Sequence, residues 1–125
     1  MKRFVIQEHH AGTHHFDLRL EKASVFVSWA VPRGIPGACG TKRLAIQVED
    51  HALSFGDFEG EIAEGEYGAG GVRVWDRGEY HPLEWTDERI VVRLTGRRVE
   101  GIYALIRFPR GGERAWLVFK KAEAG

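Results

Sequence analysis

The chain has 125 residues, 43% of them hydrophobic and 29% charged, which is the ordinary composition of a single globular domain covering residues 1–125. Its formal net charge is zero, so charge alone gives no sign of a nucleic-acid partner. No apolar run approaches the roughly 18 residues of a membrane span, and the apolar stretch near the N-terminus is too short for a signal peptide, so we expect a cytoplasmic protein. Cys39 is the single cysteine, which excludes an intramolecular disulfide and a thiolate metal cluster.

Short β-rich runs, separated by glycines and prolines, follow one another along the chain and predict an all-β sandwich or small barrel. The segment RGG at 110–112 lies between two such runs and predicts a hairpin turn. The predicted strands are 16–21, 25–31, 43–50, 71–78, 89–96, 101–108 and 115–121.

The first distinctive stretch is QEHHAGTHHFDLRLE, residues 7–21, which holds four of the six histidines. Because alternate side chains of a strand share a face, His15, Asp17 and Arg19 point one way and the apolar residues between them point to the core. The A-G-T segment lets the chain fold back, so that His9 approaches the same polar face. We expect this face to line a groove, or the interior of a barrel wide enough to hold a ligand.

Two imidazoles and one carboxylate, from His9, His15 and Asp17, form a common ligand set for a divalent transition metal with open positions. A hard carboxylate without thiolate favours Mn or Fe, and Zn or Co are alternatives. Arg19 cannot bind a metal, but it can hold an anion beside one, and this arrangement suits phosphate ester chemistry.

The stretch KRLAIQVEDH, residues 42–51, also alternates. Its alternation predicts one shared face for Arg43, Ala45, Gln47, Glu49 and His51. Arg43 and His51 would form a second phosphate clamp, and Glu49 would orient a histidine or support a metal ligand. An ordinary strand with one solvent-exposed face would have the same pattern of residues. A functional strand and an ordinary one therefore both stay open.

The glycine-rich stretch 60–78 resembles a phosphate-binding loop, but no Walker-type lysine follows and its surroundings are acidic. We interpret it as a tight structural loop that enters a strand. Residues 49–88 carry 2 basic and 12 acidic side chains, whereas residues 89–125 carry 9 basic and 3 acidic ones. Solvated strand faces or a surface that follows a duplex backbone explain this basic final third equally well.

Together, four stretches of this chain resemble the 3′-phosphoesterase domain of bacterial DNA ligase D, which also occurs in free-standing versions. The resemblance covers about residues 4–80 closely, and beyond residue 80 only the β character matches. The stretches are QEHHAGTHHFDLRLE, VSWAVPRG, KRLAIQVEDHALSFGDFEGEI and EGEYGAGGVRVWDRGEY.

The resemblance implies a small closed β-barrel with short flanking helical segments, and a manganese-dependent enzyme that processes 3′ ends in end-joining DNA repair. A phosphodiesterase step would remove a 3′-terminal ribonucleoside, and a phosphomonoesterase step would then remove the 3′-phosphate and leave a 3′-OH. The expected partners are a primer–template with such an end and a repair ligase or polymerase in trans, with no membrane.

The family motif also implies roles for particular residues. The metal ligands would be His9, His15 and Asp17. The residues that contact phosphate would be Arg19, Arg43 and His51. These three and Glu49 are the expected catalytic residues.

The chain departs from the family pattern at four positions. Arg33 replaces a frequent Lys, and Phe55 replaces a frequent Tyr, so a hydroxyl near the site is lost. His10 and His14 stand where the family often has Asp and an apolar residue. We expect neither of these histidines to be a ligand, although both bring imidazole close to the metal.

Two alternative functions stay open. One is a non-catalytic OB-like barrel that binds nucleic acid. Trp75, Trp85 and Trp116 are candidate stacking platforms for it, but core packing explains these tryptophans equally well. The other is a non-haem iron oxygenase with a triad of His15, Asp17 and His51.

Overall fold

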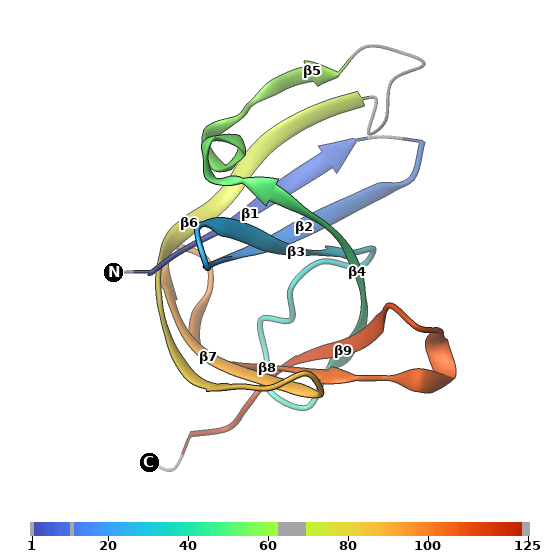
Figure 1. Cartoon of the computed structure of the whole chain (residues 1–125), viewed down its shortest axis with the longest axis vertical. Helices are drawn as coiled ribbons and strands as arrows, with labels where there is room; N and C mark the ends of the chain where they lie inside the picture. The colour runs from blue at the N-terminus through green and yellow to red at the C-terminus, as the bar shows by residue number, and fades with distance from the viewer. Residues whose placement is uncertain (1, 11, 63–69, 124–125) are drawn as a thin grey trace.

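The protein is described by a computed structural model that covers residues 2–10, 12–62 and 70–123. Eight antiparallel strands form a closed barrel, as predicted (Figure 1). The pairing of β1 with β6 closes it, and β5 (Gly60–Ile62) adds a ninth strand beside β6. In barrel order the eight strands are β1 (Lys2–His10), β2 (His14–Lys22), β3 (Val25–Val31), β4 (Lys42–Ala52), β9 (Ala115–Lys120), β8 (Glu100–Arg107), β7 (Arg89–Gly96) and β6 (Gly70–Trp85).

Helical structure within the described ranges is limited to two 3₁₀ turns, η1 (Leu53–Asp57) and η2 (Pro109–Gly111). η2 connects β8 to β9 where a hairpin turn was predicted. Among the residues that the structure describes, no helix has the length and hydropathy needed to cross a membrane. Part of the glycine-rich stretch, residues 63–69, lies outside the described residues, so its interpretation as a loop stays a prediction.

All seven predicted strands occur, but two features were missed. β1 was not predicted because Phe4, Val5, Ile6 and Gln7 are all buried, so the polar–apolar alternation of a half-exposed strand is absent. β6 continues well beyond the predicted end at residue 78. A Cβ atom on Gly78 would lie 2.0 Å from the carbonyl oxygen of Thr95, so this glycine permits close strand pairing and does not mark a strand end.

The inner face of the barrel forms one hydrophobic core. Burial of each large side chain there contributes about 1.5–3 kcal/mol. The core includes Phe4, Ile6, Leu18, Leu20, Trp29, Val92, Leu94, Tyr103, Leu105, Trp116 and Val118. Trp116 is only 3% exposed, and Trp75 and Trp85 also pack against this core, which contradicts the idea of three exposed stacking platforms.

The outer face of β1–β3 is covered by η1, and this cover makes a second, smaller buried layer. Gly56 of η1 lies against Phe26 and Val5, which point outward from the barrel. In Figure 1, β5 and the green turn of η1 lie above β1–β3, towards the top of the view. The space between this cover and the wall contains the polar residues described next.

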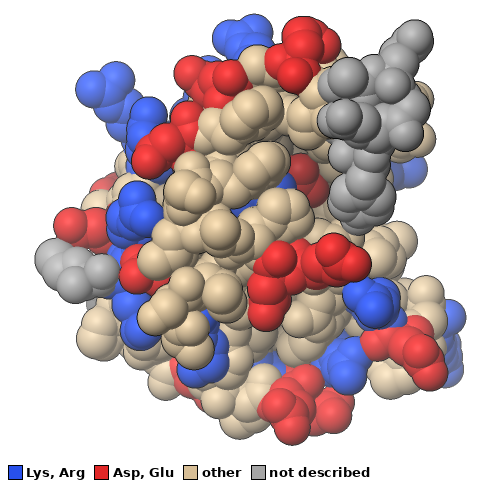
Figure 2. Space-filling model, turned by 45° about the horizontal axis from the view of Figure 1, so that its top comes forward, with Lys and Arg blue, Asp and Glu red and all other residues tan. Residues whose placement is uncertain are grey.

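The surface is mixed in charge. On the face seen in Figure 2, acidic and basic side chains are interspersed, and the described residues there form no continuous basic surface. In this view the uneven charge along the chain does not produce a single basic face.

Candidate metal and phosphate site

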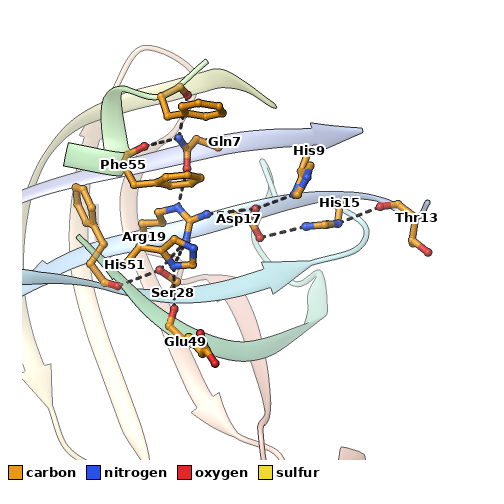
Figure 3. A network of polar contacts seen from close by, with 12 residues as sticks. Gln7, His9, Thr13, His15, Asp17, Arg19, Ser28, Glu49, His51 and Phe55 are labelled. Atoms are coloured by element: carbon orange, nitrogen blue, oxygen red, sulfur yellow. Dashed lines mark hydrogen bonds and ion pairs between the residues drawn. The ribbon is translucent and has the colours of Figure 1, made fainter. Parts of the chain in front are cut away.

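A cavity of about 350 Å³ opens on the outer face of the barrel wall. It is therefore a groove outside the barrel, one of the two positions that the sequence left open. Its lining consists of His9, His15, Asp17, Arg19, Ala30, Val48, His51, Phe55, Ile62 and Val72. Figure 3 shows that the polar members form one connected network.

Three of these residues, His9, His15 and Asp17, meet at one end of the network. His9 and His15 are direct partners in the β1–β2 hairpin, and Asp17 lies two residues along β2 on the same face. One Asp17 oxygen is 3.5 Å from His9 Nδ1, and the other is 3.2 Å from His15 Nε2. One possible ligand atom from each residue lies within 4.8 Å of the others. Strand alternation therefore brings these three residues together as predicted.

The chemistry of this trio fits a divalent cation. His15 Nδ1 donates a hydrogen bond to the carbonyl oxygen of Thr13 at 3.0 Å, which leaves Nε2 to face Asp17. The hydrogen bond with Asp17 raises the pKa of His15, against the lowering effect of burial. Burial alone would raise the pKa of Asp17, but the hydrogen bond from His15 and the charge of Arg19 bring it below its usual value. An ionised carboxylate thus stands between two imidazoles, where a metal ion would replace the proton on His15.

Arg19 occupies the centre of the network and is only 3% exposed. Its Nε donates to Gln7 Oε1 at 2.6 Å, and its Nη1 donates to Ser28 Oγ at 2.9 Å. Nη2 approaches Asp17 Oδ2 at 3.5 Å. The ring of Phe55 covers the guanidinium group, 4.9 Å from its central carbon. These contacts fix the arginine beside the carboxylate with its planar fork held in one orientation.

Gln7 and Ser28 belong to this site, although sequence reasoning did not single them out. Gln7 is fully buried, and its Nε2 donates to the carbonyl oxygens of Phe55 and Phe58 at 2.8 and 3.1 Å. It therefore ties Arg19 to the covering segment. Ser28 lies opposite Arg19 in the β2–β3 pairing. Gln7 is two residues before His9, so the same period-two pattern would have identified it once β1 was recognised as a strand.

His51 forms the other wall of the network. Its Nδ1 lies 2.9 Å from the carbonyl oxygen of Glu49 and 3.1 Å from Arg19 Nη1. One ring nitrogen cannot donate to the first and accept from the second. A proton on Nδ1 pairs with the Glu49 carbonyl oxygen, which can only accept, and in that tautomer Nε2 is an acceptor. Burial and the charge of Arg19 lower the pKa of His51, so its ring is neutral at pH 7.

The predicted shared face of β4 is wrong because the strand contains a bulge. The pairing of β4 with β3 shifts by one residue between Val48 and His51, and this turns His51 to the face of Val48 and away from that of Gln47. Gln47 instead accepts a hydrogen bond from Trp116 Nε1 at 3.1 Å, and Ala45 is in the core.

Neither Arg43 nor Glu49 lines the cavity. Arg43 Nη1 donates to the carbonyl oxygens of Arg33 and Gly34 at 2.8 and 3.1 Å, and Arg43 does not line the cavity. Glu49 contacts His51 through its backbone carbonyl, whereas its exposed side chain lies at a different hollow beside η2. The phosphate role of Arg43 and the catalytic role of Glu49 stay predictions.

The oxygenase alternative required His51 to join His15 and Asp17 as a ligand. Among the described residues, the ligand group that contains His15 and Asp17 is completed by His9. Nδ1 of His51 is engaged by Glu49 and Arg19 on the far side of the guanidinium group (Figure 3). The geometry therefore places an arginine and a third histidine beside a trio of candidate metal ligands.

Comparison with known proteins shows the family of the chain. A family model described as the DNA Ligase D 3′-phosphoesterase domain matches residues 7–107. The chain is 48% identical over 121 residues to the multifunctional non-homologous end joining protein LigD of Mycobacterium bovis, across 94% of this chain and 16% of that protein. It is 44% identical over 124 residues to the corresponding LigD protein of Pseudomonas aeruginosa, across 94% of this chain and 15% of that protein. The chain thus covers only a small part of the length of these relatives. It belongs to the family of DNA ligase D 3′-phosphoesterase domains.

Proposed function

We propose that this protein is a metal-dependent phosphoesterase that processes the 3′ ends of DNA strands for end-joining repair. It would remove a 3′-terminal ribonucleoside and then the remaining 3′-phosphate, leaving a 3′-OH. The observation that carries the proposal is the placement of Arg19 and His51 beside the group of His9, His15 and Asp17, in one cavity. The family membership and the non-homologous end joining names of the relatives support the same reaction class.

In the proposed reaction, His9, His15 and Asp17 would hold the metal. A bound divalent ion, Mn²⁺ being the expected one, would polarise a phosphoryl oxygen and lower the pKa of a coordinated water. Arg19 supplies fixed positive charge beside this position, held there by its contacts with Gln7 and Ser28.

His51 contributes through its protonation state. Because its pKa is lowered, the neutral ring suits acceptance of a proton at Nε2 better than donation of one. The proton would come from the attacking water or from a ribose hydroxyl. The apolar side chains of Val48, Val72 and Phe55 line the same cavity and limit the access of bulk water to these groups.

The proposal is tested on a 5′-labelled DNA primer that ends in one ribonucleotide and is annealed to a template, with Mn²⁺ and no polymerase. We expect the wild type to shorten the primer by one nucleoside to a 3′-phosphate end, and then to convert that end to 3′-OH. EDTA and His15→Ala should abolish both steps. The matched control is His81→Ala, which removes an exposed histidine on β6 far along the chain from the site and should leave both steps intact.

A second primer that already ends in a 3′-phosphate isolates the monoesterase step. If the wild type alters neither primer while it still binds them, and His15→Ala binds equally well, the enzyme proposal is wrong and a binding module remains. Separate titration of a ligase or polymerase into the reaction tests the proposed partner in trans. A partner that leaves both rates unchanged would remove that part of the proposal.

A further inference from the structure

The β1–β2 hairpin carries a second group of possible metal ligands on its opposite face. Glu8 and His10 are two residues apart in β1, and His14 is the direct cross-strand partner of His10. Alternation along the two strands therefore points these three residues away from the face of His9 and His15. From the sequence, neither His10 nor His14 was expected to be a ligand. Their orientation explains why they lie apart from His9 and His15, but it also places them together as possible ligands of a different ion.

The three side chains converge on one point. His14 Nε2 lies 2.8 Å and His10 Nε2 lies 3.4 Å from the same oxygen of Glu8. The two imidazole rings are stacked, with centroids 4.3 Å apart and planes within 9° of parallel. One possible ligand atom from each residue lies within 4.8 Å of the others. A cation could bind here with little rearrangement of the side chains.

The surroundings favour a cation that keeps open positions. The His10 and His14 side chains are 53% and 49% exposed, so solvent can reach the point of convergence. On the barrel side, the Phe16 ring forms an apolar wall, with its centroid 5.3 Å from that of the His14 ring. Glu59 and Glu61 line the hollow that also contains His10, opposed by Arg73.

We propose that Glu8, His10 and His14 form a second divalent metal site, distinct from the one on the cavity face. Two imidazoles and one carboxylate with open positions suit Zn²⁺ or another late first-row ion. The ligands come from both strands, so the bound ion would clamp β1 to β2 beside the hairpin connection. That clamp would hold the register that places His9 opposite His15. This inference does not depend on the proposed reaction.

The test is the number of Zn²⁺ ions that the metal-free protein retains in equilibrium dialysis at micromolar free Zn²⁺. We expect the wild type to bind two equivalents, His14→Gln and His15→Gln to bind one each, and the double variant to bind none. His10→Gln should match His14→Gln, and His81→Gln is the control that should keep both equivalents.

A spectroscopic measurement locates the second ion. In the His15→Gln protein, Zn²⁺ should shift the NMR signals of the His10 and His14 rings, which solvent exposure leaves free to respond. Two results would overturn the inference: retention of the full wild-type amount of Zn²⁺ by both His10→Gln and His14→Gln, or Zn²⁺-insensitive His10 and His14 signals.

Discussion

At the scale of single residues, the most informative feature is the buried charge of Arg19. Moving a guanidinium group out of water costs several kcal/mol unless its donors find partners. Here the partners are Gln7, Ser28 and Asp17, with Phe55 over the face of the group. This desolvation cost has a functional explanation if Arg19 must keep one orientation beside a charged ligand.

Gln7 should therefore matter to both stability and activity. Gln7→Leu removes the acceptor of Arg19 Nε and the donor to two backbone carbonyls, and leaves these buried groups unpaired. We expect a loss of roughly 1–3 kcal/mol in the free energy of unfolding, measured by urea denaturation. Because Arg19 would no longer be held, phosphoesterase activity should fall about 10- to 100-fold.

The matched control for this prediction is Gln47→Leu, which removes the hydrogen bond to Trp116 outside the cavity. It should lower stability by about 1 kcal/mol and leave activity unchanged. Equal activity of the Gln7 and Gln47 variants would show that Gln7 supports only the fold.

His51 gives a prediction about pH. In the metal-free protein, NMR titration of its ring should give a pKa below the ordinary value of 6.5, because of burial and the charge of Arg19. Arg19→Gln removes the charge and should raise this pKa, whereas burial continues to lower it. A wild-type pKa at or above 6.5, or one unaffected by Arg19→Gln, would contradict the assignment.

The sign of the stability effect makes NMR the better measurement. A lowered folded-state pKa means that His51 stabilises the fold above pH 6.5 and that this contribution is lost as pH falls below that value. His15 has a raised pKa, so its contribution is present below pH 6.5 and is lost as pH rises. Together the two effects give a stability maximum near pH 6.5 in thermal melts, which does not separate one ring from the other, whereas the two rings titrate separately in a spectrum.

At the scale of elements, the β1–β2 hairpin shows what a strand pattern can predict. Strict period-two alternation was enough to place His15, Asp17 and Arg19 on one face, with His9 beside them. The same rule failed on β4, because one extra residue before His51 inverts every later side chain. The local sequence of β4 contains no recognisable signal for that bulge, so only the structure reveals its position.

The covering turn η1 gives the second prediction at this scale. A Cβ atom on Gly56 would lie 2.5 Å from the Phe26 ring. Gly56→Ala should therefore push η1 outward. We expect the free energy of unfolding, measured by thermal denaturation, to fall by about 1–3 kcal/mol. Because Phe55 and the carbonyl acceptors of Gln7 move with η1, activity should fall by more than this loss of folded protein explains.

Gly37→Ala is the control, since a Cβ atom at Gly37 would meet no atom within 4 Å. Its stability should stay within about 0.5 kcal/mol of the wild type, as is usual for exposed substitutions. If Gly56→Ala is as stable and as active as Gly37→Ala, η1 does not support the site.

At the scale of the whole molecule, Asp76 connects the strand that closes the barrel to the turn between β7 and β8. Its two carboxylate oxygens accept hydrogen bonds from four backbone N–H groups. The donors are those of Arg77, Arg97, Arg98 and Val99. This carboxylate is 6% exposed and lies at the register shift between β1 and β6.

Asp76→Asn would replace an acceptor oxygen by an amide that faces N–H donors. We expect a loss of roughly 3 kcal/mol in the free energy of unfolding, measured by urea denaturation. Asp87→Asn makes the same charge change at an exposed position and should have little effect. Similar stabilities of the two variants would mean that the turn is held by other contacts.

The barrel itself was predictable from the spacing of short β-rich runs, but its closure was not. β1 is buried on both faces, so the strand that pairs with both β2 and β6 had no visible alternation. Because β1 was not predicted, the sequence also did not identify Gln7 as a site residue or the covered outer face where the cavity lies. The ligand trio could be found from local pattern because it needs only one hairpin, whereas Ser28, Phe55 and the final position of His51 depend on packing across several strands.

The proposed function requires that one cavity on the outer face of the barrel bind a metal ion and a phosphate side by side. The most direct measurement is an anomalous difference map from crystals grown with Mn²⁺ and inorganic phosphate. We expect a manganese peak bounded by His9, His15 and Asp17, with phosphate beside it against Arg19 and His51. No manganese at that trio, or phosphate bound at Arg43 with Arg19 and His51 left unliganded, would contradict it.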